Sequence, residues 1–127
     1  DFMVMTCTPI RVAVRLRRHI FLRPYGHEFT IRWSRPGGIA TEIDKIRAGL
    51  VDYLLYGFVD VQEQKIVQYF LGDLRLFRQL RRPPIKIATN TPPDSEFAEF
   101  AISDMAPVFL LNAWPPAPVA LQTTPSR

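Results

Sequence analysis

The fold is decided by residues 41–80, TEIDKIRAGLVDYLLYGFVDVQEQKIVQYFLGDLRLFRQL, where helix and strand signals follow one another without a proline. Thr41 is a good helix N-cap, acidic residues follow it in the first turn, and Gly49 ends the helix. Aromatic and β-branched residues then crowd both faces of 51–59 and 65–71. These two segments therefore predict a hairpin of two central strands joined by a polar turn.

A second capped helix is expected after the hairpin. Asp73 is positioned as the N-cap of a helix over 74–82, and two prolines follow that helix and terminate it. Alternation over 85–88 predicts a short strand, and residues 95–102 favour a third short helix.

Two runs of alternating residues precede this block. Within the segment 10–16, apolar residues alternate with basic ones, which predicts a half-buried strand with a basic outer face. Residues 28–33 alternate in the same way, and a turn-like segment lies between the two runs, so they are expected to pair as an antiparallel hairpin. The arginines expected on one shared face of that hairpin are Arg11, Arg15, Arg17 and Arg32.

The order of these elements predicts the fold class. It indicates a single α+β domain, with a mainly antiparallel sheet of four to five strands and two or three short helices. We expect this globular domain to span residues 1–104 and to be followed by a Pro-rich apolar arm over 105–127. Residues 105–121 carry no charge, but their prolines rule out a membrane-spanning helix. The arm is therefore expected to pack on the core or on a partner, with no membrane association.

Positive charge is concentrated at the N-terminal end. The net charge of the chain is +4, and residues 1–36 contain seven arginines against two acidic residues. The planar guanidinium fork suits phosphate groups, so the four arginines of the predicted hairpin are candidate nucleic-acid contacts. A solvated basic face is the alternative interpretation.

Four residues of the 41–80 block resemble a catalytic motif. Asp52 begins a hydrophobic strand, and Glu63 and Lys65 form an acid-x-Lys triplet before the next one. Together with Glu42 in the upstream helix, they resemble the motif of the PD-(D/E)XK nuclease superfamily, over residues 41–80 only. The resemblance implies that Asp52 and Glu63 hold Mg²⁺, that Lys65 assists the attacking water, and that Glu42 is an auxiliary acid. The alternative is that Glu63 and Lys65 are solvated turn residues.

The sequence therefore supports two functions of different classes. The first is a small nucleic-acid-associated protein with Mg²⁺-dependent phosphodiesterase activity. The second is a non-catalytic protein–protein interaction module, homodimeric or with another partner, that uses residues 105–121 or a sheet edge. The single cysteine, Cys7, cannot form an internal disulfide, which fits either a reducing compartment or indifference to the redox state of the surroundings. We expect a cytoplasmic protein.

Overall fold

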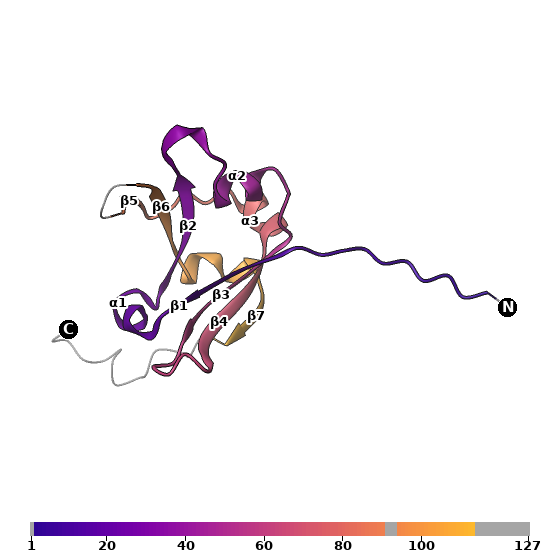
Figure 1. Ribbon diagram of the computed structural model, residues 1–127, viewed down its shortest axis with the longest axis horizontal. Helices are drawn as coiled ribbons and strands as arrows, with labels where there is room; N and C mark the ends of the chain where they lie inside the picture. Colours follow the sequence, from indigo (N-terminus) through magenta and orange to yellow (C-terminus); the bar gives the residue numbers. More distant parts are fainter. Residues whose placement is uncertain (1, 91–93, 114–127) are drawn as a thin grey trace.

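The computed structural model describes residues 2–90 and 94–113 of the 127-residue chain (Figure 1). Within these ranges, short helices connect strands that form two sheets. In chain order, with η for a 3₁₀ turn, the elements are β1 (Val12–Arg17), η1 (His19–Phe21), α1 (Leu22–Tyr25), β2 (Glu28–Ser34), η2 (Pro36–Gly38), α2 (Glu42–Arg47), β3 (Tyr53–Val59), β4 (Ile66–Asp73), α3 (Leu74–Leu80), β5 (Lys86–Thr89), β6 (Glu96–Ala101), η3 (Ser103–Val108) and β7 (Phe109–Ala113).

The strands are divided between a four-stranded and a three-stranded sheet. The first has the order β1-β3-β4-β7, with β1 parallel to β3 and the other pairs antiparallel. The second has the order β2-β6-β5 and is antiparallel throughout. The α+β class is confirmed, with the strands in two sheets where one was expected. No helix in the described ranges is long and apolar enough to cross a membrane.

Residues 41–80 fold as their sequence predicts. Thr41 and Asp44 form a capping box at the start of α2, in which the Thr41 N–H donates to Asp44 Oδ2 over 2.9 Å. β3 and β4 form the expected hairpin and are the two central strands of their sheet. Asp73 caps α3, because its Oδ1 accepts hydrogen bonds from two backbone N–H groups of the first turn.

The predicted hairpin of the first two strands is wrong. β1 pairs with β3 in parallel, whereas β2 pairs with β6 in the other sheet. Between β1 and β2 the chain folds into η1 and α1, which carry it from one sheet to the other. Alternation identifies a strand, but it does not identify the strand's partner.

The two faces of β1 are also the reverse of the prediction. Val12, Val14 and Leu16 are 45%, 60% and 42% exposed, whereas Arg15 and Arg17 are half-buried. In the register with β3, these two arginines lie beside Tyr56 and Phe58, which face the core. Arginine tolerates this position because its alkyl stem packs on apolar surface while the guanidinium reaches a polar environment.

The helix predicted over 95–102 is a strand. Residues 96–101 form β6, the central strand of the three-stranded sheet, and its Ala98 and Phe100 are buried in the core. The segment is rich in Ala and Glu, which favour helices. Hydrogen bonding to β2 on one side and to β5 on the other overrides that local preference.

The apolar arm predicted from residue 105 onwards begins later. Met105 and Val108 in η3 are 2% and 4% exposed and belong to the core. Residues 109–113 then form β7, which pairs with β4 at the edge of the four-stranded sheet. The rest of the predicted arm, 114–127, lies outside the described residues.

Aromatic rings join the two sheets. Phe29 of β2 stacks on Phe100 of β6 with ring centroids 5.3 Å apart, and it meets the ring of Phe70 in β4 edge-on at 5.1 Å. Tyr56 of β3 stacks on Phe70 at 5.6 Å and is completely buried. The Tyr56 hydroxyl is a buried polar group that has no hydrogen-bond partner. The core therefore contains one unsatisfied oxygen among its described residues.

Replacing Tyr56 by Phe should leave the protein at least as stable, because it removes this oxygen and keeps the ring. An unsatisfied buried polar group costs about 1–3 kcal/mol, so the free energy of unfolding should stay the same or rise by up to about 1 kcal/mol. Urea unfolding measures the change. Tyr53→Phe on the outer face is the control and should be neutral. A loss of more than about 1 kcal/mol in Tyr56→Phe would show that the hydroxyl has a partner.

Candidate functional site

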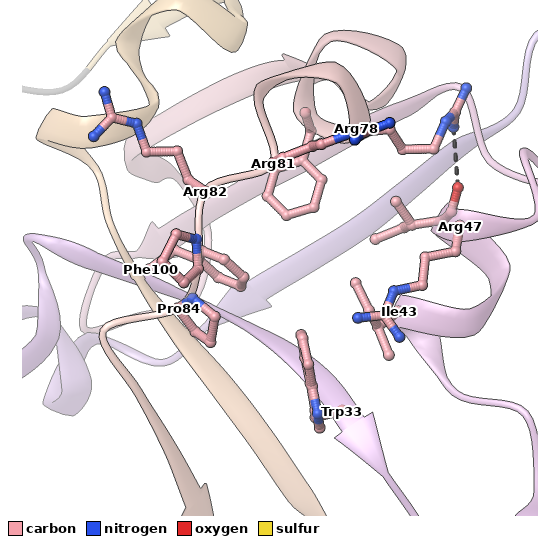
Figure 2. Close-up of a pocket in the computed structure, with 11 residues that line it drawn as sticks. Trp33, Ile43, Arg47, Arg78, Arg81, Arg82, Pro84 and Phe100 are labelled. Atoms are coloured by element: carbon pink, nitrogen blue, oxygen red, sulfur yellow. Dashed lines mark hydrogen bonds between the residues drawn. The ribbon is translucent and has the colours of Figure 1, made fainter.

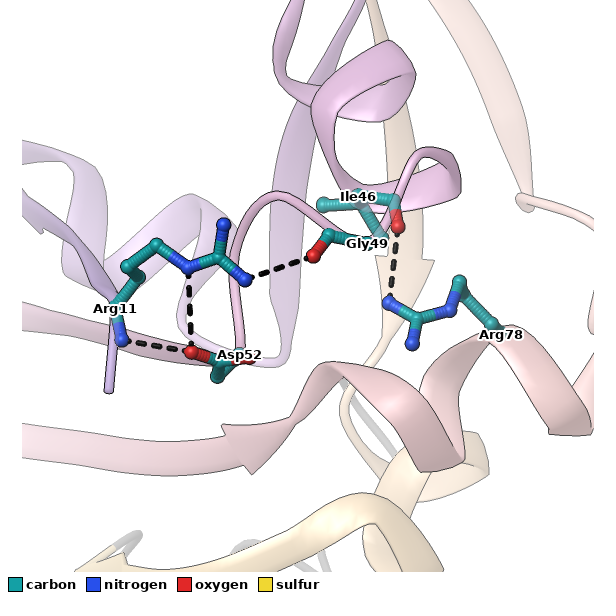
Figure 3. Close-up of polar contacts among 5 residues, drawn as sticks. All are labelled: Arg11, Ile46, Gly49, Asp52 and Arg78. Carbon is teal, nitrogen blue, oxygen red and sulfur yellow. Dashed lines mark hydrogen bonds and ion pairs between the residues drawn. The ribbon is translucent and has the colours of Figure 1, made fainter. Parts of the chain in front are cut away.

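Asp52 lies between α2 and β3 and fastens β1 to this connection (Figure 3). Its Oδ2 accepts hydrogen bonds from the backbone N–H of Arg11 at 2.8 Å and from Arg11 Nε at 3.4 Å. Arg11 Nη2 also donates to the Gly49 carbonyl at 3.0 Å. The backbone N–H of Arg11 is the main cause that lowers the pKa of Asp52 below its ordinary value, and the Arg11 side chain lowers it further. The ionised Asp52 carboxylate thus joins the α2–β3 connection to Arg11, the residue that precedes β1.

Glu42 and Glu63 are also paired with arginines from the region of β1. Arg15 Nη1 donates to Glu42 Oε1 at 2.8 Å, at the first residue of α2. Arg18 Nε donates to Glu63 Oε1 at 2.9 Å, in the turn between β3 and β4. Each acid of the nuclease-like motif therefore has a different basic partner.

The turn that holds Glu63 is built around another carboxylate. Asp60 Oδ1 accepts hydrogen bonds from the backbone N–H groups of Gln64 and Lys65 at 2.8 and 3.2 Å. Glu63 itself has a positive φ of 58°, and its side chain and that of Lys65 are exposed. The structure therefore places both residues in a solvated turn, which is the alternative left open by the sequence.

Asp52 and Glu63 are not brought together. They lie at opposite ends of β3, whose seven residues span roughly 20 Å at a rise of about 3.3 Å per residue. Mg²⁺ needs its oxygen ligands at about 2.0–2.1 Å, so these carboxylates cannot share one ion. Within 2–90 and 94–113, no group of three or more His, Cys, Asp or Glu side chains is placed to hold a metal ion. The residues present do not fit the Mg²⁺ site that the resemblance implies.

Three of the four candidate nucleic-acid contacts do meet, in a groove of about 580 Å³ that we call the basic groove. Arg15 and Arg17 come from the inner face of β1, and Arg32 comes from β2. Arg11 does not line this groove, because it is held at Asp52. The lining also includes Phe21, Tyr25, Glu28, Thr30, Phe97 and Glu99.

Aromatic rings hold Arg17 in the basic groove. Its Cζ lies 4.7 Å from the ring centroid of Phe21, 5.4 Å from that of Tyr25 and 6.0 Å from that of Phe58. Cation–π contacts of this kind contribute about 0.5–2 kcal/mol each. Arg17 forms no ion pair with a carboxylate in the described part of the chain. Its positive charge is fixed in position and is not neutralised by an acidic side chain.

The acidic residues of the groove have partners of their own. Glu28 Oε1 lies 3.2 Å from Nε2 of His27, and Glu99 Oε2 lies 4.0 Å from Lys86 Nζ. Arg32 acts at a distance on Asp94: it is a minor cause of the lowered pKa of that carboxyl, after the hydrogen bonds from Asn90 and Ser95. The groove lining thus has three arginines against two carboxylates, and Arg15 is also paired with Glu42, so its positive excess lies at Arg17 and Arg32.

Sequence reasoning missed a second cavity, of about 480 Å³, lined by Arg47, Arg78, Arg81 and Arg82 (Figure 2). The last two follow α3, which ends at Leu80, two residues before the predicted end of the helix at 82. The signal that points to them is the density of arginine in 78–82, which places Arg78 in the last turn of α3 and Arg81 and Arg82 directly after it.

Comparison of the chain with protein-family models, with curated proteins and with solved structures returned no match. Neither the nuclease resemblance nor another family assignment gains support from these comparisons. Function must therefore be argued from the geometry and the charge of the sites themselves.

The hydrogen bonds between Arg11 and the Asp52 carboxylate should make the stability of the protein depend on pH. A carboxyl whose pKa is lowered on folding stabilises the protein above its unfolded pKa of about 3.9, and this stabilisation is lost as the pH falls through the folded pKa. Asp52→Asn should therefore lower the urea midpoint near pH 7, and the gap to the unmodified protein should narrow as the pH falls to about 3. A gap of constant size across this range would contradict a role for the ionised carboxylate.

Proposed function

We propose that the protein binds single-stranded nucleic acid along the basic groove. The observation that carries this proposal is Arg17, whose guanidinium is held on two aromatic rings without an acidic partner and lies in one cavity with Arg15 and Arg32. Proteins that bind single strands combine positive charge along the backbone with aromatic rings on which bases stack. Tyr25 and Phe97 supply such rings in the groove.

The shape of the groove favours a single strand over a duplex. The groove has a volume of about 580 Å³ and is lined by residues of both sheets and of α1. Reading the bases of a duplex uses a helix or ribbon that enters a groove of the nucleic acid. An unpaired strand can instead lay its bases into a protein groove of this size.

The distribution of charge agrees with a phosphate-bearing partner. The chain has a net charge of +4 and a pI near 9.6, and seven of its arginines precede residue 37. Arginine binds phosphate through two parallel N–H groups, which a lysine cannot provide. Hydrolysis by the nuclease-like motif would require Asp52 and Glu63 to share a metal ion, and β3 keeps them apart. The proposal is therefore one of binding and assigns no cleavage to these residues.

Arg17→Ala should weaken binding of a fluorescently labelled oligothymidine about tenfold, because one phosphate contact and the neighbouring stacking surface are lost together. Fluorescence anisotropy measures the affinity, and the slope of log K against log salt should fall by about 0.7 for the lost contact. Arg35→Ala is the control: it removes the same charge from an exposed residue outside the groove. Equal losses in the two variants would show that only net charge matters and would overturn the proposal.

The outer face of the four-stranded sheet favours a second function. In the register of the sheet, Val12 and Val14 of β1 lie beside Tyr53 and Leu55 of β3. The same face continues through Leu71 of β4 to Leu111 of β7, which is 57% exposed. None of these positions carries a charge, and none packs on the described core. Monomeric proteins rarely expose apolar patches larger than a few hundred Å².

We infer that this outer face binds a second copy of the chain. A flat apolar sheet face can be self-complementary about a two-fold axis, as homodimers require. Stable dimers bury about 800 Å² per partner, and one feature extends the face toward that area. The apolar segment 2–5 precedes β1, is more than 80% exposed at each residue, and runs away from the body of its own chain (Figure 1). It is free to lie on the partner.

The protein should therefore sediment as a dimer at about 10 μM, and Val14→Lys should convert it to a monomer, because a buried unpaired charge destabilises an apolar interface. Sedimentation velocity measures both states. Val61→Lys, at an apolar residue in the exposed β3–β4 turn, should remain dimeric. A monomeric unmodified protein would contradict this second function and would leave the basic groove unaffected.

A further inference from the structure

The second cavity, which we call the cationic pocket, lies between α2, α3 and β2. It is separate from the basic groove, because side chains three residues apart in a strand lie on opposite faces of the sheet. Phe97 of β6 lines the groove on one face, and Phe100 of β6 lines the cationic pocket on the other. The two cavities therefore lie back to back across one sheet.

Four arginines line the cationic pocket, and no carboxylate does. Arg47 comes from the end of α2, Arg78 from α3, and Arg81 and Arg82 from the turn after α3. In Figure 2 the side chains of Arg47 and Arg82 lie at opposite ends of the pocket. Asp44 interacts electrostatically with Arg47, and Asp52 interacts with Arg78, but both carboxylates lie outside the lining. The lining itself is purely cationic, which favours a ligand that carries negative charge.

The rest of the lining is aromatic and apolar. Trp33 forms one wall, and its ring centroid lies 4.8 Å from Arg47 Cζ. Phe77 and Phe100 meet edge-on nearby, with ring centroids 5.3 Å apart. An inorganic anion gains nothing from these rings, whereas a planar heterocycle can stack on Trp33 beside the guanidinium. The pocket thus matches a ligand that is aromatic at one end and anionic at the other.

Two features fix the arginines in place. Arg78 Nη1 donates to the Ile46 carbonyl at the end of α2 over 3.0 Å, which orients its guanidinium and leaves its other N–H groups available (Figure 3). Arg81 has a φ of 51°, in the left-handed region that is uncommon for residues other than glycine. This turn redirects the chain after α3, so that Arg81 and Arg82 both line the pocket before Pro83. Such strained residues concentrate at binding sites.

We propose that the cationic pocket binds a nucleoside phosphate, with the base stacked on Trp33 beside Arg47 and the phosphate held at the opposite end, where Arg82 lies. This site goes beyond the strand-binding groove and does not depend on it, because the two cavities share no lining residue. The ligand is either a free nucleotide or the phosphorylated end of a nucleic-acid strand, since both present the same chemistry.

Trp33 makes the proposal directly measurable. The chain has two tryptophans, so Trp114→Phe leaves Trp33 as the only one. AMP should then quench the fluorescence saturably with a dissociation constant below about 1 mM. Adenosine and inorganic phosphate should each bind at least tenfold more weakly, because each lacks one half of the ligand. A short 5′-phosphorylated oligonucleotide, compared with its unphosphorylated form, distinguishes a strand end from a free nucleotide as the ligand.

Arg47→Ala and Arg82→Ala, made in the same background, should each weaken AMP binding at least tenfold. Arg23→Ala is the matched control, because Arg23 lies in α1 and lines neither cavity. Urea unfolding of each variant shows whether the fold is kept, and two arginine variants guard against the failure of one. Three results would each overturn the proposal: quenching by neither AMP nor the phosphorylated oligonucleotide, inorganic phosphate binding as tightly as AMP, or equal losses in Arg47→Ala and Arg23→Ala.

Discussion

The parallel pairing of β1 with β3 is the contact on which the basic groove and the ion pair at Asp52 depend. It determines which face of β1 meets the core, and so it turns Arg15 and Arg17 inward and leaves the valines outside. The ion pairs of β1 with Asp52, Glu42 and Glu63 follow from the same register, but exposed pairs contribute little energy. Their effect is to favour this register of β1 against β3 over registers shifted by one or two residues. The backbone ladder and the packing beside Tyr56 supply the stability.

This register also explains why the nuclease-like residues do not converge. A metal site needs several carboxylates close together, with their mutual repulsion balanced by the ion. Here each of the three acids lies beside a different arginine, spaced along β1 and its flanks. Asp52 precedes β3, and Glu63 lies in the turn that follows β3, so their spacing in the sequence reflects the length of this strand and its turn. In the fold, each of these carboxylates pairs with an arginine.

The part of the fold that could be predicted is the part governed by neighbours in the chain. Thr41, Asp73 and the β3–β4 turn act through hydrogen bonds within a few residues, and their signals were sufficient. Which face of β1 is buried, and whether 96–101 is a helix or a strand, depend on strands distant in sequence. Alternation shows that a strand has two different faces, but it does not show which face is buried. That is decided by the strand with which it pairs. The sequence predicted that Arg15, Arg17 and Arg32 lie near one another, and they do line one groove. The reason given was wrong, because the hairpin that was expected to bring them together does not form.

The cationic pocket escaped prediction for a different reason. Its arginines come from two helices and a turn, and no pair of them follows a recognised motif. The three-stranded sheet supplies aromatic rings to both cavities, Phe97 to the basic groove and Phe100 with Trp33 to the cationic pocket. Arginines from β1 and β2 face the first set of rings, and arginines from α2, α3 and the turn after α3 face the second. Arginine beside aromatic rings is thus the chemistry that the two cavities share, and it is the common basis of the two ligand proposals.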